Sequence, residues 1–322
     1  MSRRLVPWSL GLLLIAGTSD VVTATSRYEP PDGKIILMVG QTQEDTQAYL
    51  DAAKILPAGL MGYTAIHGEG LQSPYKRGAG TQYVQKLSSE HPDTVLQIGL
   101  YLVESYDAIA HGEMDAPVDR LGEWIRHIHR PVFLRLGYEF DSPDNHYQDV
   151  LYIQAYRRIV DRFRMHGVTN VAFVWHSYAS VGSQKLAAWY PGDDYVDWVG
   201  ISYFNQPQHY MQPVVQFAHD HGKPVMICES SAATFKTQYA NSWNLWFVPF
   251  FKFIASNDIK AVCYISCDWD AWPQFKNLNW GETRLQTNPE ILRHWLDETE
   301  NDRYLKSSPD LFKLLGYLEN PA

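Results

Sequence analysis

Short apolar runs alternate with longer amphipathic segments along most of this chain. The clearest runs are rich in β-branched and aromatic residues and lie at 34–40, 94–101, 132–138, 170–175, 199–203, 224–229 and 259–267, with a weaker run at 57–66. Between them, apolar residues recur at helical spacing, most clearly at 151–166. Apolar runs without alternation are typical of strands buried on both faces, so the pattern predicts a parallel sheet covered by helices.

The spacing of the runs selects one architecture. Eight strands recur at about 30 residues per strand and helix, which is the repeat of a (β/α)8 TIM barrel. The alternative is an open doubly wound sheet, which needs a glycine-rich phosphate loop after its first strand. The segment Val39-Gly-Gln-Thr-Gln-Glu44 is not such a loop. We therefore predict an α/β fold in which residues 25–322 form a single-domain barrel.

The N-terminus has the pattern of a targeting segment. Basic residues at 3–4 precede an apolar stretch at 5–17, and small residues follow at 22–24. This order is typical of a secretory signal peptide, and the apolar stretch is short for a bilayer span. We expect residues 1–24 to be removed, leaving a secreted or periplasmic protein without stable membrane insertion. A retained N-terminal membrane anchor is the alternative.

Composition narrows the classes of partner. The net charge is −9 with a pI near 5.7, and no basic run lies outside the N-terminus, so we expect no nucleic-acid partner. Aromatic residues make up 14% of the chain, which fits either a well-filled core or platforms for sugar rings. We expect three free, buried thiols at Cys228, Cys263 and Cys267, with Cys228 facing away from the barrel interior. No spacing of Cys or His resembles a metal site, so we predict no bound metal or cofactor. We also expect the protein to be a monomer.

Two glutamates stand at the ends of predicted strands. Arg135, Gly137 and Glu139 share one face of the strand predicted at 132–138. Val225, Ile227 and Glu229 share the inward face of the strand predicted at 224–229. Desolvation raises the pKa of such a carboxyl and a nearby guanidinium lowers it, a balance that suits a group donating and accepting a proton. In a barrel the two glutamates lie three strands apart on opposing sides of the catalytic rim.

The remaining strand ends carry side chains suited to sugars. They are Trp175 with His176, Tyr203 and Trp269. Two carboxyls between aromatic walls can break a glycosidic bond, one protonating the leaving oxygen while the other attacks C1. The sequence has no Gly-x-Ser-x-Gly elbow and no phosphate loop, so other chemistries are poorly supplied.

Three features of the sequence together resemble those of a known family. They are Arg135 four residues before Glu139, the strand Asn170-Val-Ala-Phe-Val-Trp175, and the segment beginning Tyr190-Pro-Gly-Asp193. The chain resembles clan A glycoside hydrolases, and within them family 26, which includes β-mannanases, lichenases and β-1,3-xylanases. The resemblance implies that Glu139 is the acid/base, Glu229 the nucleophile, Tyr203 the hydrogen-bond partner of the nucleophile, and Trp269 a sugar platform. The family usually has His directly before the acid/base, where this chain has Tyr138.

These features lead to one prediction of function. We expect a retaining, endo-acting hydrolase of a β-linked polysaccharide or oligosaccharide of β-mannan or β-glucan type. The predicted catalytic residues are Glu139 and Glu229, and the predicted substrate-binding residues are Arg135, Tyr138, Trp175, His176, Tyr203 and Trp269. Retention predicts carboxyls about 5 to 5.5 Å apart, and the acid should have a raised pKa. The alternatives are a non-catalytic carbohydrate-binding barrel and a transglycosylase on the same scaffold.

Overall fold

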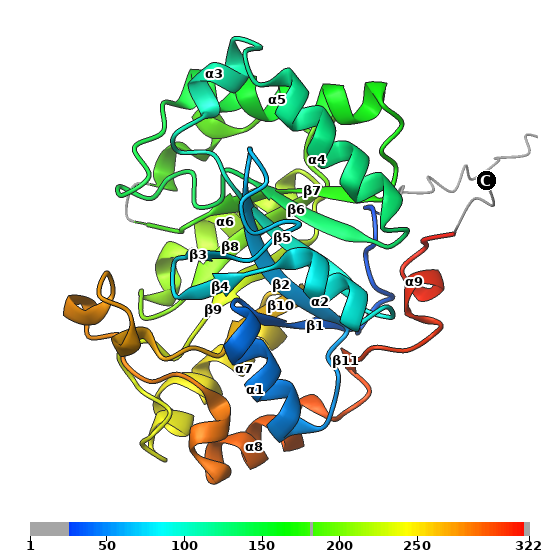
Figure 1. Ribbon diagram of the computed structural model, residues 1–322. Coiled ribbons are helices and arrows are strands. Elements are labelled where there is room, and N and C mark those ends of the chain that lie inside the picture. The colour runs from blue at the N-terminus through cyan, green and yellow to red at the C-terminus, as the bar shows by residue number, and fades with distance from the viewer. Residues whose placement is uncertain (1–25, 181–182, 319–322) are drawn as a thin grey trace, which may run out of the picture.

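Eight parallel strands close into a barrel because the first pairs with the second on one side and with the last on the other (Figure 1). The computed structural model describes residues 26–180 and 183–318, and the predicted signal segment lies outside these ranges. The barrel strands are β1 Ile35–Gly40, β2 Gly59–Ala65, β5 Val95–Tyr101, β6 Val132–Leu136, β7 Val171–Ser177, β8 Trp198–Tyr203, β9 Val225–Ser230 and β10 Ile259–Ile265. The prediction of a (β/α)8 barrel is confirmed.

Helices follow the strands around the outside of the barrel. They are α1 Gln43–Ala53, α2 Val84–Glu90, α3 Tyr106–Ala110, α4 Asp115–His127, α5 Asp149–Met165, α6 Gln212–Asp220, α7 Val248–Ser256 and α8 Pro289–Thr299. Thr42 caps α1, since its side chain accepts a hydrogen bond from the backbone N–H of Asp45 at 3.1 Å. The strongest predicted helix, 151–166, corresponds to α5.

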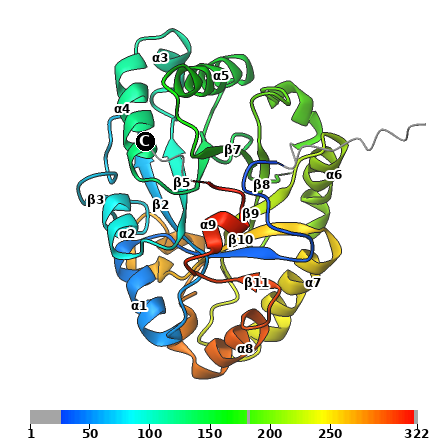
Figure 2. The same cartoon turned by 90° about the vertical axis from the view of Figure 1, so that its right-hand side faces the viewer.

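Two apolar layers hold this arrangement together. The larger lies between the strands and the helices, and the smaller fills the barrel and its base. Interior positions include Phe133 on β6, Val174 on β7 and Trp198 on β8. The short helix α9, Leu311–Leu314, lies across one end of the barrel (Figure 2), and Leu311 and Leu315 belong to the interior layer. The opposite end is therefore the one left to hold a ligand.

Short strands outside the barrel add local detail that the sequence pattern did not reveal. The glycine-rich segment at 67–80 contains β3 Tyr75–Arg77, which forms an antiparallel hairpin with β4 Gly80–Gln82. The two-residue strand β11, Tyr304–Leu305, pairs in parallel with β1. No helix in the described part of the chain is long and apolar enough to cross a membrane.

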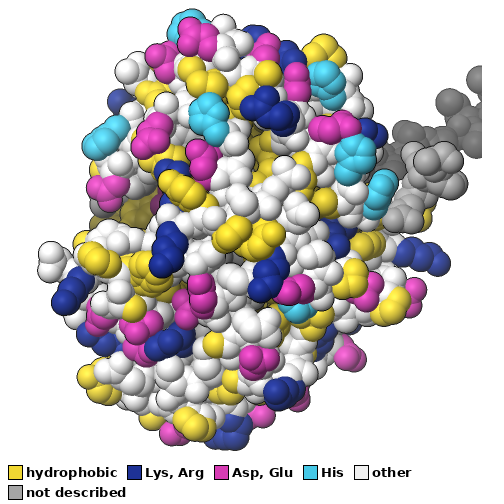
Figure 3. Space-filling model, in the orientation of Figure 1, with side chains coloured by type: hydrophobic (Ala, Val, Ile, Leu, Met, Phe, Trp, Pro, Cys, Tyr) yellow, Lys and Arg dark blue, Asp and Glu magenta, His cyan; other side chains and the backbone are white. Residues whose placement is uncertain are grey.

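Charge is spread evenly over the surface in view. Figure 3 shows Lys and Arg interspersed with Asp and Glu on this face, with no extended region of one sign. This face therefore has no basic stripe of the kind that binds nucleic-acid backbones.

Candidate active site

A pocket with a volume of about 280 Å³ opens beyond the C-terminal ends of the barrel strands. It is lined by Glu139 and Glu229 and by side chains from several strand ends and from the loop after β10. The other lining residues are Gln41, Tyr63, Arg77, Gly78, Gln82, Tyr138, Ser142, Asp144, Asn145, Tyr178, Phe204, Trp269, Phe275, Leu278 and Trp280. The structure thus brings both predicted glutamates into one cavity.

Glu139 is held in a tight turn just beyond the end of β6. Gly137 and Glu139 both have left-handed backbone conformations, with φ of 57° and 53°. A non-glycine residue rarely adopts such a φ, and it persists where neighbouring contacts fix it. The Asn145 side chain supplies these contacts, donating hydrogen bonds to the carbonyl oxygens of Tyr138 at 3.1 Å and Glu139 at 2.9 Å. The turn aims the Glu139 carboxyl into the pocket.

Glu229 reaches the same pocket through an irregularity in β9. Ile227 pairs with Ile201 of β8, but the next pair is Glu229 with Ser202, so Cys228 is the extra residue of a bulge. As a result, Val225 and Ile227 pack toward the helices, whereas both Cys228 and Glu229 face inward. The predicted orientations of Val225, Ile227 and Cys228 are wrong, since simple alternation breaks at the bulge.

A buried arginine anchors Glu229. Arg135 Nη1 forms an ion pair with Glu229 Oε1, and the arginine side chain has no exposed surface. Its guanidinium lies 5.0 Å from the ring centroid of Tyr63 and 5.1 Å from that of Tyr138. These cation–π contacts help offset the cost of burying the charge. Arg135 is therefore a partner of the carboxylate beneath the pocket, and the prediction that it binds substrate is wrong.

Glu139 has a different environment. Its Oε1 accepts a hydrogen bond from the Ser202 hydroxyl at 2.5 Å, and no cation pairs with it among the described residues. Burial, and secondarily the charge of Glu229, raise the pKa of Glu139 from 4.5 to about 8, while Ser202 and Arg135 oppose the rise. The prediction of a raised pKa for this group agrees with that direction. Two carboxyls with contrasting surroundings are the arrangement from which acid and base roles arise.

Aromatic rings form one wall of the pocket. Trp269 meets Trp280 edge to face, with centroids 4.8 Å apart, and Trp280 stacks against Phe204 at 5.5 Å. The indole N–H of Trp269 lies 3.2 Å from the Ser231 hydroxyl and 3.1 Å from that of Thr283, which fixes the ring plane. Rigid aromatic surfaces of this kind suit the apolar faces of sugar rings.

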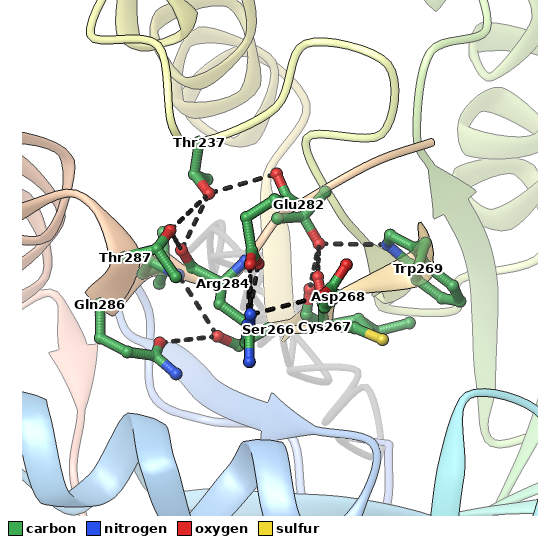
Figure 4. A network of polar contacts seen from close by, with 12 residues as sticks. Thr237, Ser266, Cys267, Asp268, Trp269, Glu282, Arg284, Gln286 and Thr287 are labelled. Carbon is green, nitrogen blue, oxygen red and sulfur yellow. Dashed lines mark hydrogen bonds and ion pairs between the residues drawn. The ribbon is translucent and has the colours of Figure 1, made fainter. Parts of the chain in front are cut away.

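A network of polar contacts braces the loop that carries Trp269 (Figure 4). Arg284 pairs with Glu282 and, at 3.4 Å, with Asp268, and the backbones of Asp268 and Glu282 form a bridge. The Thr237 hydroxyl donates to the Arg284 carbonyl at 2.8 Å, tying this loop to the one after β9. The wall is thereby held in place before any ligand arrives.

Trp175 does not face the pocket. Its side chain is fully buried on the helix-facing side of β7, where it stacks on Phe140 at 4.4 Å and donates a hydrogen bond to the Trp189 carbonyl. The inward positions of this strand are Val174 and His176. The prediction of Trp175 as a sugar platform is wrong because the opposite face of the strand turns inward.

The difference between Trp175 and Trp269 can be measured. Trp175→Ala should lower the free energy of unfolding by about 3–5 kcal/mol, because it leaves a large cavity in the outer layer, while KM stays unchanged. Trp269→Ala should raise KM about tenfold, since it removes a pocket wall. Urea unfolding and steady-state kinetics of the two variants test this. An increase in KM for Trp175→Ala alone would contradict the assignment.

Tyr203 and His176 also differ from their predicted roles. Tyr203 packs among Trp246 and Phe250 on the helix-facing side, and its hydroxyl accepts a hydrogen bond from Gln208 at 2.8 Å. It therefore does not contact Glu229, and Ser202 takes the inward position beside it. His176 is fully buried and contacts Arg135 and Ser202 instead of lining the pocket. The predictions that Tyr203 and His176 bind substrate are wrong for this reason.

Several residues in and beneath the pocket were not predicted. Tyr138 lines the cavity as predicted, and Asn145 holds the Glu139 turn. The sequence did not identify Tyr63 and Phe204, which line the cavity, or the buried Ser202, which contacts Glu139. Ser202 is adjacent to Tyr203, so an equal weight on both strand faces would have found it. No group of three or more His, Cys, Asp or Glu side chains within the described ranges could hold a metal ion.

Comparison with known proteins adds independent information. The profile of glycosyl hydrolase family 26 matches residues 94–241, a range that contains both glutamates. A β-1,3-xylanase from an Alcaligenes species is 33% identical over 320 residues, covering 89% of this chain and 68% of that protein. The β-1,3-xylanase TXYA from a Vibrio species is also 33% identical, covering 89% of this chain and 69% of its own length.

Solved structures agree on the fold. A family 26 β-mannanase from Bacteroides ovatus superposes with a TM-score of 0.65 at 13% identity, over 90% of this chain and 95% of that one. The family 26 protein GH26C from a Muricauda species superposes with a TM-score of 0.61 at 14% identity, over 88% and 90% of the two chains. At these identities the likeness concerns the barrel alone.

Proposed function

This chain belongs to glycosyl hydrolase family 26 and is a β-glycoside hydrolase, and we propose that it cleaves a β-linked polysaccharide in two steps with net retention. The observation that carries this proposal is the contrast between two carboxyls in one pocket. Glu229 is paired with the buried Arg135, whereas Glu139 has a raised pKa and a hydroxyl as its partner. Such a division supports a nucleophile and an acid/base.

In the first step, Glu139 is the acid. It gives its proton to the glycosidic oxygen while Glu229 attacks C1, so that the C1–O bond to the leaving sugar breaks as a glycosyl ester forms. The ion pair with Arg135 aims Glu229 Oε1 and leaves its second oxygen for the attack. The rise in the pKa of Glu139 matters here because the group must hold its proton near neutral pH.

In the second step, the same carboxyl acts as a base. The ionised Glu139 takes a proton from water, the water oxygen attacks C1, and the bond to Glu229 breaks. Esterification has by then removed the charge of Glu229, which is the second cause of the raised pKa of Glu139. The pKa of Glu139 therefore falls between the two steps, in the direction that each step requires.

β-1,3-Xylan is the substrate that the comparisons favour. Both relatives at 33% identity are named β-1,3-xylanases, and each matches 89% of this chain. Tyr138 and Tyr63 meet edge to face at 5.2 Å and both line the pocket, so their rings occupy part of the room open to a sugar. A xylose ring has no hydroxymethyl arm and needs less room there than glucose or mannose. The mannan or glucan preference expected from the sequence therefore becomes the second choice.

A substrate panel with analysis of the products tests the proposal. The purified protein should release a ladder of oligosaccharides from β-1,3-xylan, and release less from β-mannan, mixed-linkage β-glucan, β-1,3-glucan and β-1,4-xylan. Proton NMR during the first minutes should show the β-anomer of the new reducing end before mutarotation. Initial release of the α-anomer would contradict retention. Binding without turnover would favour a carbohydrate-binding barrel, and products longer than the substrate would favour a transglycosylase.

A further inference from the structure

Three buried side chains connect the two carboxyls beneath the pocket. Arg135 Nη1 pairs with Glu229 and also lies 3.3 Å from Nδ1 of His176. His176 Nε2 lies 3.0 Å from the Ser202 hydroxyl, which lies 2.5 Å from Glu139 Oε1. Arg135, His176 and Ser202 are all fully buried. The mechanism proposed above uses Arg135 but assigns nothing to His176 or Ser202.

The direction of each hydrogen bond between Arg135 and Glu139 follows from the donors and acceptors at the two ends of the series. Arginine has only donors, so His176 Nδ1 must accept. Burial and the charge of Arg135 lower the pKa of His176 well below 6.5 and outweigh a hydrogen bond to the Ile201 backbone, which raises it. The ring is therefore neutral, and because Nδ1 accepts, its single proton is on Nε2. That N–H donates to Ser202 Oγ, which leaves the hydroxyl proton free to donate to Glu139 Oε1. Each donor therefore points toward Glu139.

A donated hydrogen bond at one carboxyl oxygen fixes where the proton of the acid lies. Oε1 accepts from Ser202, so the proton of Glu139 occupies Oε2. Within residues 26–180 and 183–318, no group forms a hydrogen bond with Oε2, and the carboxyl lines the pocket. Oε2 is thus the oxygen free to meet the glycosidic oxygen of a bound sugar.

We propose that Ser202 and His176 are positioning residues that keep the transferable proton of Glu139 on Oε2, the carboxyl oxygen that faces the substrate. This inference rests on the proposed role of Glu139 as acid/base. The same hydrogen bond stabilises the carboxylate once the proton has left, which prepares Glu139 to act as a base in the second step. Arg135 couples this device to the nucleophile, since one guanidinium nitrogen contacts both Glu229 and His176.

Other charged and titratable groups also act on Glu139. They are Glu229 on β9, Arg135 on β6, Asp141 in its own turn, and the neighbouring Tyr138, Tyr178 and Cys228. Burial and Glu229 raise the pKa of Glu139, and the Ser202 hydrogen bond is the first of the influences that lower it. Loss of this bond should therefore raise the pKa further.

Ser202→Ala tests the proposal through two readouts that general destabilisation does not alter. The alkaline limb of kcat/KM on β-1,3-xylan should move up by about one pH unit, because the acid keeps its proton to higher pH. At neutral pH, kcat/KM on the polysaccharide should fall about tenfold. It should change little on a 2,4-dinitrophenyl β-xylobioside, whose leaving group needs no proton. Ser202→Thr keeps a hydroxyl and should restore both values.

Two matched variants complete the experiment. Ser242→Ala removes a buried hydroxyl that donates to the carbonyls of Phe235 and Lys236, away from the pocket, and should leave the pH profile unchanged. Glu139→Ala reports on the proposed function itself. One outcome would show that the positioning role is wrong while the acid/base role stands. In that outcome, Ser202→Ala keeps the alkaline limb of the wild type and lowers kcat/KM equally on both substrates. Glu139→Ala, in contrast, loses activity on β-1,3-xylan but keeps it on the 2,4-dinitrophenyl β-xylobioside. Full activity of Glu139→Ala on β-1,3-xylan would overturn the acid/base role.

Discussion

Glu229→Gln is expected to lower kcat on β-1,3-xylan by about 10⁵-fold, the largest loss that a single substitution should produce in this protein. Glutamine keeps the shape of the side chain but is too weak a nucleophile to form the glycosyl ester. The defect should be equally large on a 2,4-dinitrophenyl β-xylobioside, because an easier leaving group does not replace the attacking atom. Steady-state kinetics on both substrates measure the effect.

The same substitution should also cost stability. It removes the charge that balances Arg135, whose side chain has no exposed surface. Breaking a buried ion pair by removing one partner typically costs about 3–5 kcal/mol. Urea unfolding should show this loss, and kinetics measured well below the transition separate it from the catalytic defect.

A remote ion pair provides the matched control. Asp115 on α4 contacts Arg158 and Arg162 on α5, each at 2.6 Å, and lies on the outer surface of the barrel. Asp115→Asn should lose some stability but retain the wild-type kcat. Glu229→Ala with azide gives a further test, since azide entering from the vacated side should produce the α-glycosyl azide. Activity of Glu229→Gln within tenfold of wild type would remove Glu229 from the role of nucleophile.

The barrel was predictable because its signal is repeated many times. Each strand is an apolar run bounded by polar residues, and α5 has a full apolar stripe. One weak unit, such as β2, does not change the result when seven others have the same spacing. The hairpin of β3 and β4 had no comparable signal, because its strands are only three residues long and follow glycines in a polar segment.

The orientation of side chains on each strand was less predictable, for a physical reason. Parallel barrel strands are buried on both faces, so the sequence shows no polar face to mark the outside. Trp175 and His176 are both fully buried, yet only His176 points into the barrel. On β8, likewise, Ser202 points into the barrel and Tyr203 points toward the helices. A large aromatic residue at a strand end is therefore weak evidence for a sugar platform.

The partner of Arg135 depended on geometry that no local pattern encodes. Sequence proximity suggested Glu139, only four residues away, but the ion pair joins Arg135 to Glu229 across the barrel. The bulge at Cys228 turns Glu229 inward, and the left-handed turn at Glu139 carries that carboxyl away from its own strand. Both irregularities occur at the candidate catalytic residues, where strained backbone is most often retained.

Glu139→Gln is expected to lower kcat/KM on β-1,3-xylan by about 10³-fold and to abolish the alkaline limb of its pH profile. In the wild type, the first step needs protonated Glu139, so activity should be lost as pH rises through the pKa of this group, which lies at about 8. Glutamine cannot ionise, and its residual activity should be independent of pH in this range. On a 2,4-dinitrophenyl β-xylobioside, kcat/KM should stay near the wild-type value, because that leaving group departs without protonation.

Stability gives a second measurement with a defined sign. Folding raises the pKa of Glu139 from 4.5 to about 8, so the folded state binds the proton more tightly than the unfolded chain. The contribution of this group to stability is complete below pH 4.5 and is lost as pH rises through about 8. Glu139→Gln removes that loss and should unfold at a higher temperature than the wild type above pH 8, with the difference shrinking toward pH 4.

An exposed carboxylate serves as the control for both profiles. Glu123 on α4 pairs with Arg126 at the surface, so Glu123→Gln should leave the alkaline limb and its position unchanged. Glu139→Ala with azide should yield the β-glycosyl azide, because azide then attacks the glycosyl ester from the side that water normally uses. An alkaline limb that persists in Glu139→Gln would assign the titration to another group, and a loss equal on both substrates would show that Glu139 does not protonate the leaving group.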